Sequence, residues 1–337
     1  MAPDPTLGRP PTIRTVAARA GVSKSLVSLV LQNSPRVSEP KRQAVLKAVA
    51  ELGYRPDPVA RSLAERRTRT VGVVIDDLSN PWYVELLDGL RPALHEHGLR
   101  PLLADGHTEP DAVQALSDLR VDGLVLVGTP TLSAIDQVEA LAGQIPTVVA
   151  GTREPRLSAV DVVANDDYRG ARLATAHLLE LGHRRIAHIV GEGEVGRLRR
   201  AGFEATMADV DSHPRCLPGD WTEATGRRVA TELLRSSERP TAILAANDLS
   251  AVGVLAAADD LGLRVPEDLS VVGYDNTVFA RLHRLSLTTI DGHIAEVGQV
   301  AGRTLTARID GDDGTVGTRL LAPALVVRSS TGGPSSR

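Results

Sequence analysis

Hydrophobic and polar positions along the chain follow two different periodicities. Residues 12–53 repeat at helical spacing and predict three short helices, over 13–20, over 24–32 and between Ser38 and Gly53. From residue 71 onward, short apolar runs alternate with longer helical patterns. The apolar runs predict strands over 71–75, 101–104, 123–127, 147–149, 160–163, 185–190, 242–245 and 269–272. The helical patterns between them cover 84–97, 111–119, 168–181, 199–208, 226–236, 249–261 and 294–309.

This alternation of strands and helices is typical of α/β proteins, in which helices cover both faces of parallel sheets. About 265 residues follow the pattern, which is more than one doubly wound domain usually holds. We therefore expect two similar α/β lobes behind a small helical head.

The first two helices of the head have clear boundaries. Thr12 suits the N-cap of the first helix, Gly21 can adopt the left-handed conformation that ends it, and Ser23 suits the N-cap of the second. Two short helices joined by a Gly-containing turn form a helix-turn-helix, whose second helix enters the major groove of DNA. The same turn also occurs in ordinary helical hairpins, so this pattern alone leaves both interpretations open.

The third helix is followed by an unusual segment. The helix should begin after a cap at Ser38. Its apolar face is predicted to consist of Val45, Leu46, Val49 and Leu52. Residues 58–67 are Arg-rich and too poor in apolar side chains to pack a core, and a helix this short should form only when something holds it. Leu63 in this segment is either available to a partner or a buried linker residue.

Formal charge is distributed unevenly along the chain. The whole sequence carries −4, but residues 1–67 hold twelve Lys or Arg against five Asp or Glu, a balance of +7 that leaves −11 for the remainder. A basic head on an acidic body is typical of a polyanion-binding module joined to a part that does not bind DNA.

Composition also limits the cellular compartment in which we expect the protein and the chemistry that it can carry out. No run of 18 uncharged apolar residues predicts a membrane span, although 42% of the residues are hydrophobic. The first residues lack a hydrophobic secretory core, so we expect a cytoplasmic protein. Cys216 is the single cysteine, which excludes an internal disulfide and a thiolate metal cluster. We expect neither a metal nor a cofactor.

Two sets of residues occur in a characteristic order. The head contains Thr12, Val16, Ala17, Ala20, Gly21, Val22, Ser23, Val27, Ser28, Val37, Ser38, Gly53, Tyr54, Pro56, Val59, Ala60, Leu63 and Ala64. The body contains residues 168–171, His177, Leu178, residues 181–187, Arg199, Gly202, Phe203, Asn247, Asp248, Ala251, Gly253 and residues 262–276. In this order they resemble the LacI/GalR family of bacterial transcription regulators over about residues 12–330.

The resemblance implies three parts. They are a helix-turn-helix DNA-binding head at 10–56, a hinge helix and linker at 57–67, and a two-lobed periplasmic-binding-protein-like body with parallel sheets at 68–330. The body would bind an effector and dimerise. Lobe 1 would span about 68–167 and 295–322, and lobe 2 about 168–292 and 323–330. The resemblance further implies a homodimeric repressor that binds a pseudo-palindromic double-stranded DNA operator and responds allosterically to a small effector.

By the same resemblance, the hinge helix lies in the minor groove and Leu63 is a wedge between base pairs. An inserted apolar side chain costs unstacking energy, which the contacts of the bent duplex offset. The predicted DNA contacts are Thr12, Ser23, Lys24, Ser25, Ser28, Leu29, Tyr54, Val59, Ala60 and Leu63.

Two residues depart from the family pattern. Leu29 stands where many members carry Arg, and Leu cannot make the bidentate contact to guanine that Arg makes. We therefore expect Leu29 to contact a thymine methyl group. Asp57 stands where the family usually has Asn, and its charge near the phosphates should weaken hinge docking.

Ligands of open parallel sheets bind beyond the carboxyl ends of the strands, so the residues after each predicted strand are candidates for an effector site. They are rich in carboxylates, carboxamides and aromatic rings, which suits a sugar or a related polyol. The candidates are Asp76, Trp82, Tyr83, Arg153, Arg199, Trp221, Asn247, Asp275 and Asp291. The resemblance supports six of them, Trp82, Tyr83, Arg199, Trp221, Asn247 and Asp275. Alternatively, Arg199 and Asp275 form a structural ion pair and Trp221 packs between the lobes.

Two other classes of function remain as alternatives. Residues 191–196 form a Gly-x-Gly-x-x-Gly pattern between a predicted strand and a predicted helix, which is the dinucleotide fingerprint of NAD-dependent oxidoreductases. Against it, Glu192 and Glu194 lie where a pyrophosphate needs bare backbone N–H groups, and the motif is far from the first strand. A transport solute-binding protein would share the two-lobed body, but the basic head argues against it.

Overall fold

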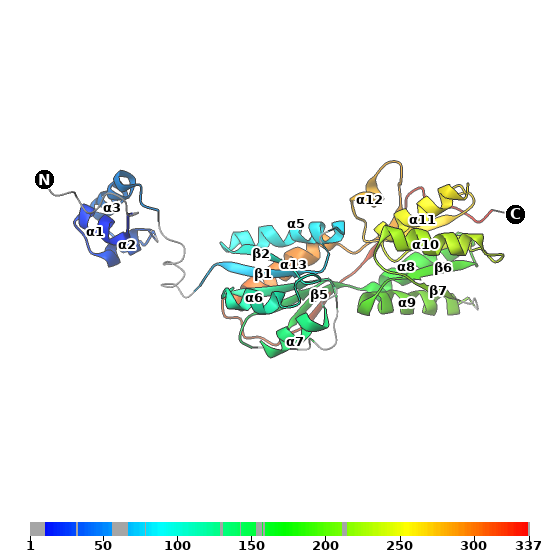
Figure 1. Cartoon of the computed structure of the whole chain (residues 1–337), viewed down its shortest axis with the longest axis horizontal. Coiled ribbons are helices and arrows are strands. Elements are labelled where there is room, and N and C mark those ends of the chain that lie inside the picture. Colours follow the sequence, from blue (N-terminus) through cyan, green and yellow to red (C-terminus); the bar gives the residue numbers. More distant parts are fainter. Residues whose placement is uncertain are drawn as a thin grey trace. The chain divides into compact units, whose positions relative to one another are not determined.

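The computed structural model describes residues 11–31, 33–55, 67–77, 79–128, 131–141, 143–152, 157, 159–210 and 214–335. The chain divides into two units, residues 1–68 and 69–337 (Figure 1). The predicted hinge positions Val59, Ala60 and Leu63 and the effector candidate Arg153 lie outside the described residues.

The first unit contains helices α1 (Ile13–Ala20), α2 (Lys24–Leu31) and α3 (Glu39–Leu52). The predicted caps of α1 and α2 are confirmed. The Thr12 side chain accepts a hydrogen bond from the Thr15 N–H, and the Ser23 hydroxyl accepts one from the Leu26 N–H at 3.2 Å. Ser38 stands at the N-cap of α3, but its side chain makes no capping hydrogen bond, so that part of the prediction is wrong.

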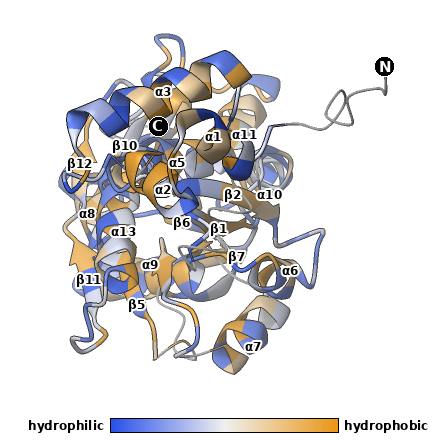
Figure 2. Cartoon of the chain, turned by 90° about the vertical axis from the view of Figure 1, so that its left-hand side faces the viewer, coloured by the Kyte–Doolittle hydropathy of each residue, from blue (hydrophilic) through white to orange (hydrophobic). Residues whose placement is uncertain are grey.

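A small apolar core holds the three helices together. It consists of Val16, Ala17, Val27, Val30, Val37, Val45 and Ala48. The predicted apolar face of α3 is wrong at Leu46, which is 43% exposed, because the buried face continues from Val45 to Ala48, one helical turn further. Helix α3 therefore has both hydrophobic and hydrophilic residues along it (Figure 2).

The second unit contains two six-stranded sheets. The first has the order β11-β5-β4-β3-β1-β2, with all its paired strands parallel. Its strands are β1 (Thr70–Ile75), β2 (Arg100–Asp105), β3 (Gly123–Val127), β4 (Thr147–Ala150), β5 (Asp161–Asn165) and β11 (Thr318–Leu321). With α5 (Pro81–Glu96), α6 (Ala112–Asp118), α7 (Leu132–Ala140) and α13 (Ile294–Ile309) they form what we call lobe 1.

The second sheet has the order β12-β10-β9-β8-β6-β7, in which only the pair β10 and β12 is antiparallel. Its strands are β6 (Ile186–Val190), β7 (Arg215–Pro218), β8 (Ala242–Leu244), β9 (Ser270–Tyr274), β10 (Thr288–Asp291) and β12 (Ala324–Val326). The helices of this lobe 2 are α8 (Asp167–Glu180), α9 (Gly193–Ala208), α10 (Glu223–Arg235), α11 (Asp248–Asp260) and α12 (Val278–Arg281). In the described residues the chain crosses between the lobes after β5, after β10 and after β11.

The predicted α/β class with parallel sheets is confirmed, and each predicted strand and helix of the body corresponds to an observed element. Helix α9 begins at Gly193, six residues before the predicted start, because two glycines with low helix propensity conceal its first turns. Prediction missed β7, β10, β11, β12, α7 and α12. No helix in the described part of the chain has both the length and the apolar character needed to cross a bilayer.

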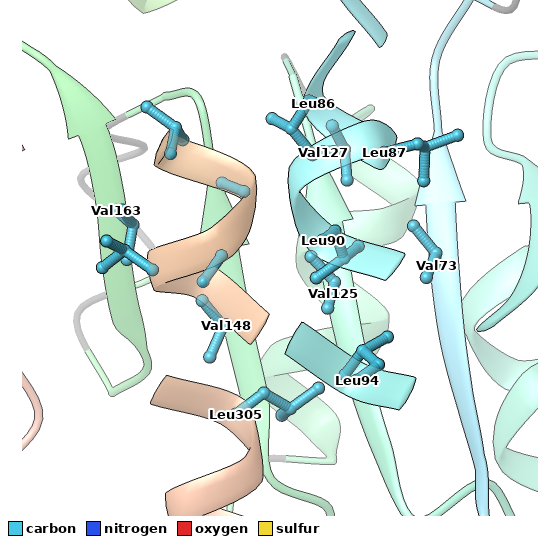
Figure 3. Packing of buried hydrophobic residues seen from close by; sticks show 14 of the residues in the cluster. Val73, Leu86, Leu87, Leu90, Leu94, Val125, Val127, Val148, Val163 and Leu305 are labelled. Atoms are coloured by element: carbon cyan, nitrogen blue, oxygen red, sulfur yellow. The ribbon is translucent and has the colours of Figure 1, made fainter. Parts of the chain in front are cut away.

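Helices α5 and α13 cover one face of the first sheet. Figure 3 shows Leu86, Leu90 and Leu94 of α5 and Leu305 of α13 packed against valines of the strands. The two helices approach closely where glycine replaces a side chain. A Cβ on Gly298 would lie 2.0 Å from the carbonyl oxygen of Leu86, and one on Gly89 would lie 1.8 Å from that of Ala295.

We expect Gly298→Ala to destabilise lobe 1, since its methyl group must push α13 away from α5. Overpacking of this kind costs about 1–3 kcal/mol of the free energy of unfolding. Thermal denaturation of the purified protein should show a lower Tm. Gly317→Ala is the matched control, because a Cβ at Gly317 has no heavy atom within 4 Å. Equal Tm values for the two variants would contradict the close contact between the helices.

Candidate functional site

A cavity lies between the lobes. Lobe 1 contributes Asp77, Asn80, Trp82, Tyr83, Gly128, Gly151 and Asn165 to its described lining. Lobe 2 contributes Val195, Arg199, Trp221, Asn247 and Asp275.

Strand register explains why residues distant in sequence meet at this cavity. Ile75 of β1 is aligned with Val127 of β3, and Val127 with Ala150 of β4. The residues that follow these parallel strands therefore emerge at one edge of the first sheet, where ligands of such sheets bind. Asp275 occupies the equivalent place after β9 in the second sheet.

Arg199 on α9 is the most highly connected side chain of the cavity. Its Nε donates to Asp167 Oδ1 at 2.9 Å, its Nη1 to the Ala246 carbonyl at 2.7 Å and its Nη2 to Asp275 Oδ1 at 3.3 Å. The guanidinium carbon also lies 3.4 Å from the centroid of the Tyr274 ring. Arg199 and Asp275 thus form a structural ion pair and are also part of the cavity wall. Their contact with an effector stays a prediction.

Asp275 is held in an unusual state. Its φ of 105° lies in the left-handed region, which non-Gly residues seldom adopt. Burial raises the pKa of its carboxyl to about 8, Arg199 opposes this rise, and the charges of Asp248 and Asp167 add to it.

Aromatic rings form walls of the cavity, and glycines leave room for them. Trp82 and Tyr83 meet edge to face, with ring centroids 5.1 Å apart. Gly151 has a φ of 94°, and a Cβ there would lie 2.2 Å from the Trp82 ring. Gly128 has a φ of 82°, and a Cβ there would lie 2.4 Å from the Tyr83 hydroxyl.

The glycines of residues 191–196 have a packing role. A Cβ on Gly191 would lie 2.3 Å from the Trp221 ring, and a Cβ on Gly196 would lie 1.8 Å from the Gly191 carbonyl oxygen. Glu194, in the first turn of α9, forms an ion pair with Arg197. The glycines of the Gly-x-Gly-x-x-Gly pattern are therefore explained by packing, because the Trp221 ring and the first turn of α9 leave no room for side chains there.

Two of the three asparagine side chains in the described lining, those of Asn165 and Asn247, bridge separate parts of the cavity wall. Asn247 caps α11 by accepting from the Ser250 N–H at 2.8 Å, and it donates to the Trp221 carbonyl at 3.2 Å. Asn165, at the end of β5 in lobe 1, donates to the Tyr274 hydroxyl of lobe 2 at 3.1 Å. Both residues therefore hold the walls in position.

A further contact links the lobes. Glu85 on α5 accepts hydrogen bonds from the Val278 N–H at 3.0 Å and from Arg281 Nη2 at 2.6 Å, at the start and end of α12. Helix α5 also carries Trp82 and Tyr83. Movement of one lobe against the other must therefore break or rearrange a contact on the same helix that forms the aromatic wall.

Two predicted effector residues lie outside the described lining of the cavity. Asp76 is absent from the described lining, since its neighbour Asp77 faces the cavity while Asp76 lies near His107, at 3.9 Å. Asp291 is also absent from that lining, because it accepts from Asn276 Nδ2 at 3.0 Å and from the His293 N–H at 2.8 Å where the chain leaves β10. Prediction from sequence missed Asp77, Asn80, Gly128, Gly151, Asn165 and Val195 as lining residues. The available signal was a position at or just after the end of a strand, which Asp77, Gly128, Gly151 and Asn165 share.

The head exposes a polar helix face that can reach DNA. Lys24 and Ser25 are exposed, Leu29 is 37% exposed, and Val27 and Val30 on the other side of α2 are buried. Thr12 and Ser23 are exposed caps, Ser28 and Tyr54 are half-buried. The exposure of Lys24, Ser25 and Leu29 fits a second helix that presents one face to a groove while the other packs on the core.

A helix-turn-helix head and a two-lobed α/β body with a cavity between its sheets define a class of DNA-binding regulators. Residues 12–57 match the bacterial regulatory proteins of the lacI family, and residues 175–331 match the periplasmic binding protein-like domain. The transcriptional repressor PurR of Erwinia tasmaniensis is 34% identical over 328 residues, covering 95% of this chain and 96% of PurR.

Solved structures agree with this classification. The lac repressor dimer bound to operator and the anti-inducer ONPF has a TM-score of 0.87 at 30% identity, over 96% of this chain and 100% of that one. A complex of the transcriptional regulator CelR with cellobiose has a TM-score of 0.71 at 32% identity, over 95% and 99%. The chain belongs to the LacI family of bacterial regulatory proteins, which confirms the resemblance noted in its sequence. It is a DNA-binding regulator and not an enzyme, so the oxidoreductase alternative is wrong.

The raised pKa of Asp275 predicts a pH-dependent stability. A carboxyl whose folded-state pKa is about 8, above its usual value of 3.8, stabilises the fold fully below pH of about 4. That contribution is lost as pH rises toward 8. Asp275→Asn cannot titrate, so the Tm of the wild type relative to this variant should fall steadily between pH 5 and pH 8.

Asp118→Asn removes a carboxylate from the exposed surface of α6 and serves as the matched control for the charge change. A Tm difference between the wild type and Asp275→Asn that stays constant or grows with pH would show that Asp275 is ionised in the folded protein throughout.

Proposed function

We propose that this protein is a cytoplasmic, homodimeric repressor of transcription whose affinity for a pseudo-palindromic operator is set by a small sugar-like effector between its lobes. The observation that carries the proposal is the interlobe cavity, in which a buried carboxyl and aromatic walls meet on a chain that begins with a helix-turn-helix. We place the protein in the cytoplasm because the DNA that it would bind lies there.

Charge and exposure in the head support operator binding. Residues 1–67 carry +7, which favours the phosphate backbone, and the exposed side chains of α2 are available to base edges. Two copies related by a two-fold axis recognise two inverted half-sites, which makes the operator pseudo-palindromic. Leu29 contacts a thymine methyl group at one base pair of each half-site.

The chemistry of the cavity supports a hydroxylated ring as the effector. Asp275 and Asp77 accept hydrogen bonds from hydroxyl groups, and the rings of Trp82 and Trp221 offer apolar faces to a sugar ring. Relatives supply precedents for a bound small molecule, since the CelR structure contains cellobiose and the lac repressor structure contains the anti-inducer ONPF.

Effector binding is coupled to operator binding because the ligand contacts both lobes. A ligand that contacts Asp77 and Asp275 favours one arrangement of the lobes over another and so shifts their equilibrium. The spacing of the two hinge segments at 57–67 then changes, which forms or melts short helices there. Val59, Ala60 and Leu63 contact the minor groove only in the helical state, with Leu63 as the wedge.

Selection of binding sites from random duplex DNA tests the operator part of the proposal. The wild-type protein should enrich a pseudo-palindromic site, with an affinity that falls steeply with salt concentration. Leu29→Arg should change the preferred base pair at one symmetric position from A·T to G·C, with about 1–3 kcal/mol of discrimination. Leu46→Arg adds the same charge at a comparably exposed Leu of α3 and should leave the site unchanged. Failure to enrich any site, or the same change with both variants, would refute the assignment.

Thermal denaturation with a panel of sugars, polyols and nucleosides tests the effector part. A ligand present at about 100 times its Kd raises the free energy of unfolding by about 2.7 kcal/mol, which raises the Tm. The same compound should alter operator affinity. Trp221→Ala should remove the rise in Tm, whereas Tyr168→Ala truncates an aromatic outside the described lining and should retain it. A rise that persists in Trp221→Ala would place the ligand elsewhere.

A further inference from the structure

The C-terminal end of α2 is closed by a tight turn. The Asn33 N–H donates to the Val30 carbonyl at 3.0 Å, and the Ser34 N–H donates to the Leu29 carbonyl at 2.9 Å. This pair of hydrogen bonds is the Schellman motif, in which a residue just beyond the helix adopts the left-handed conformation. Asn33 adopts it with a φ of 53°. The turn therefore begins at Leu29, the residue that we expect to contact a thymine methyl group.

Two features of α2 leave this turn in need of support. Gly is the usual residue in the left-handed position, because a Cβ there crowds the following carbonyl oxygen, and Asn33 carries such a Cβ. Basic side chains in the last turn of a helix stabilise the negative end of its dipole. The last turn of α2, as described over Lys24–Leu31, contains no basic residue. Support for the turn has to come from another part of the head.

Arg42 of α3 supplies that support. Its Nη1 donates to Asn33 Oδ1 at 2.9 Å, and its Nη2 donates to the Ser34 carbonyl at 2.6 Å. The Arg42 side chain is 16% exposed, although arginine side chains are mostly exposed in proteins. One guanidinium thus holds both residues of the turn in a fixed fork, and it places a positive charge at the C-terminal end of α2.

The surroundings of Arg42 favour a role within the head over a contact to DNA. Its third nitrogen, Nε, lies 3.7 Å from Glu39 Oε2, so each guanidinium nitrogen faces a protein acceptor. The Glu39 carboxylate is exposed and would repel a phosphate group that approached the guanidinium. Lys24 and Ser25 are exposed at the opposite end of α2, where the Ser23 hydroxyl caps the helix. The two ends of α2 are therefore held by different means.

We propose that Arg42 is a positioning residue for base recognition. By fixing the turn at Asn33 and Ser34, it fixes the last turn of α2 and the direction in which Leu29 meets the major groove. Arg42 acts through these residues and does not itself contact DNA. This inference rests on the proposed function in assuming that α2 reads an operator. It adds that discrimination at the base pair of Leu29 depends on a residue of another helix.

Arg42→Lys tests this contact, because Lys keeps the charge but cannot hold two acceptors in a fixed fork. Hydrogen exchange of residues 29–36 is measured by mass spectrometry on the full-length protein without DNA. Exchange in the variant should be faster by about tenfold, which is the effect of losing one hydrogen bond to a charged group. Exchange of α1 should stay as in the wild type. Arg14→Lys makes the same substitution at an exposed position of α1 and should leave residues 29–36 unchanged.

Operator binding by Arg42→Lys then separates positioning from a contact to phosphate. A phosphate contact would survive this substitution, since Lys also binds phosphate as a point charge. Positioning predicts a loss of about tenfold in discrimination at the base pair that Leu29→Arg identifies, with the affinity for random duplex DNA unchanged. Arg14→Lys should retain the discrimination of the wild type.

Unchanged exchange of residues 29–36 in Arg42→Lys would overturn the proposal. Wild-type discrimination would overturn it too, and so would an equal loss of affinity for operator and random duplex. If Arg42→Lys fails to fold, adding Asn33→Gly should restore folding, because Gly adopts the left-handed conformation without help. A combined variant that stays unfolded would place the role of Arg42 elsewhere.

The exchange measurement uses no DNA, so it does not depend on the proposed function. A wild-type protein that enriches no operator would refute the proposed function, whereas unchanged exchange would refute the role of Arg42. The two failures can therefore be told apart.

Discussion

One buried guanidinium determines the shape of the ligand cavity. Arg199 projects from α9 and binds the start of α8 through Asp167, the segment after β8 through Ala246, and the end of β9 through Asp275 and the face of Tyr274. A buried charge is tolerated only when hydrogen-bonded partners surround it, so these elements cannot separate without exposing an unpaired ion. The strained backbone of Asp275 persists because this network holds it. The second lobe therefore presents an already organised wall to whatever enters.

The opposite wall is organised by shape. Trp82 and Tyr83 occupy space that Gly151 and Gly128 leave open at the ends of β4 and β3. Both glycines have positive φ, so a side chain there would be excluded twice, by the ring and by the backbone conformation. Lobe 1 thus contributes apolar surface fixed by packing, and lobe 2 contributes polar groups fixed by hydrogen bonds. A ring-shaped polar compound needs both.

A helix or strand of this structure could be predicted from the sequence when its hydrophobic pattern was clear. Strands buried on both faces, such as β3, appear as continuous apolar runs and were found. Strand β10 escaped prediction because it begins with two threonines, whose hydroxyls are satisfied by Asp248 and by the Arg328 carbonyl only after folding. Edge strand β11 is exposed except at Leu321, so it shows neither an alternating pattern nor a continuous buried one.

The location of the cavity could be predicted from the sequence, but the residues that line it could be predicted only in part. The rule that ligands lie beyond strand ends identified the right segments, and resemblance to the LacI family identified Arg199 and Asp275. Neither could decide between adjacent carboxylates: the sequence favoured Asp76, whereas Asp77 belongs to the described lining of the cavity. That choice depends on the direction of one side chain after β1, which follows from the loop geometry.

The crossing of the chain between its lobes has a consequence for biosynthesis. Helix α13 and strand β11 complete the core and the edge of lobe 1, yet they follow the whole of β6 to β10 in sequence. A ribosome that has released residues 69–165 has therefore made only part of the first lobe, whose exposed leucines on α5 have no α13 to cover them. The first lobe to begin emerging closes its core only after most of the second has been translated. The last segment made thus completes both lobes.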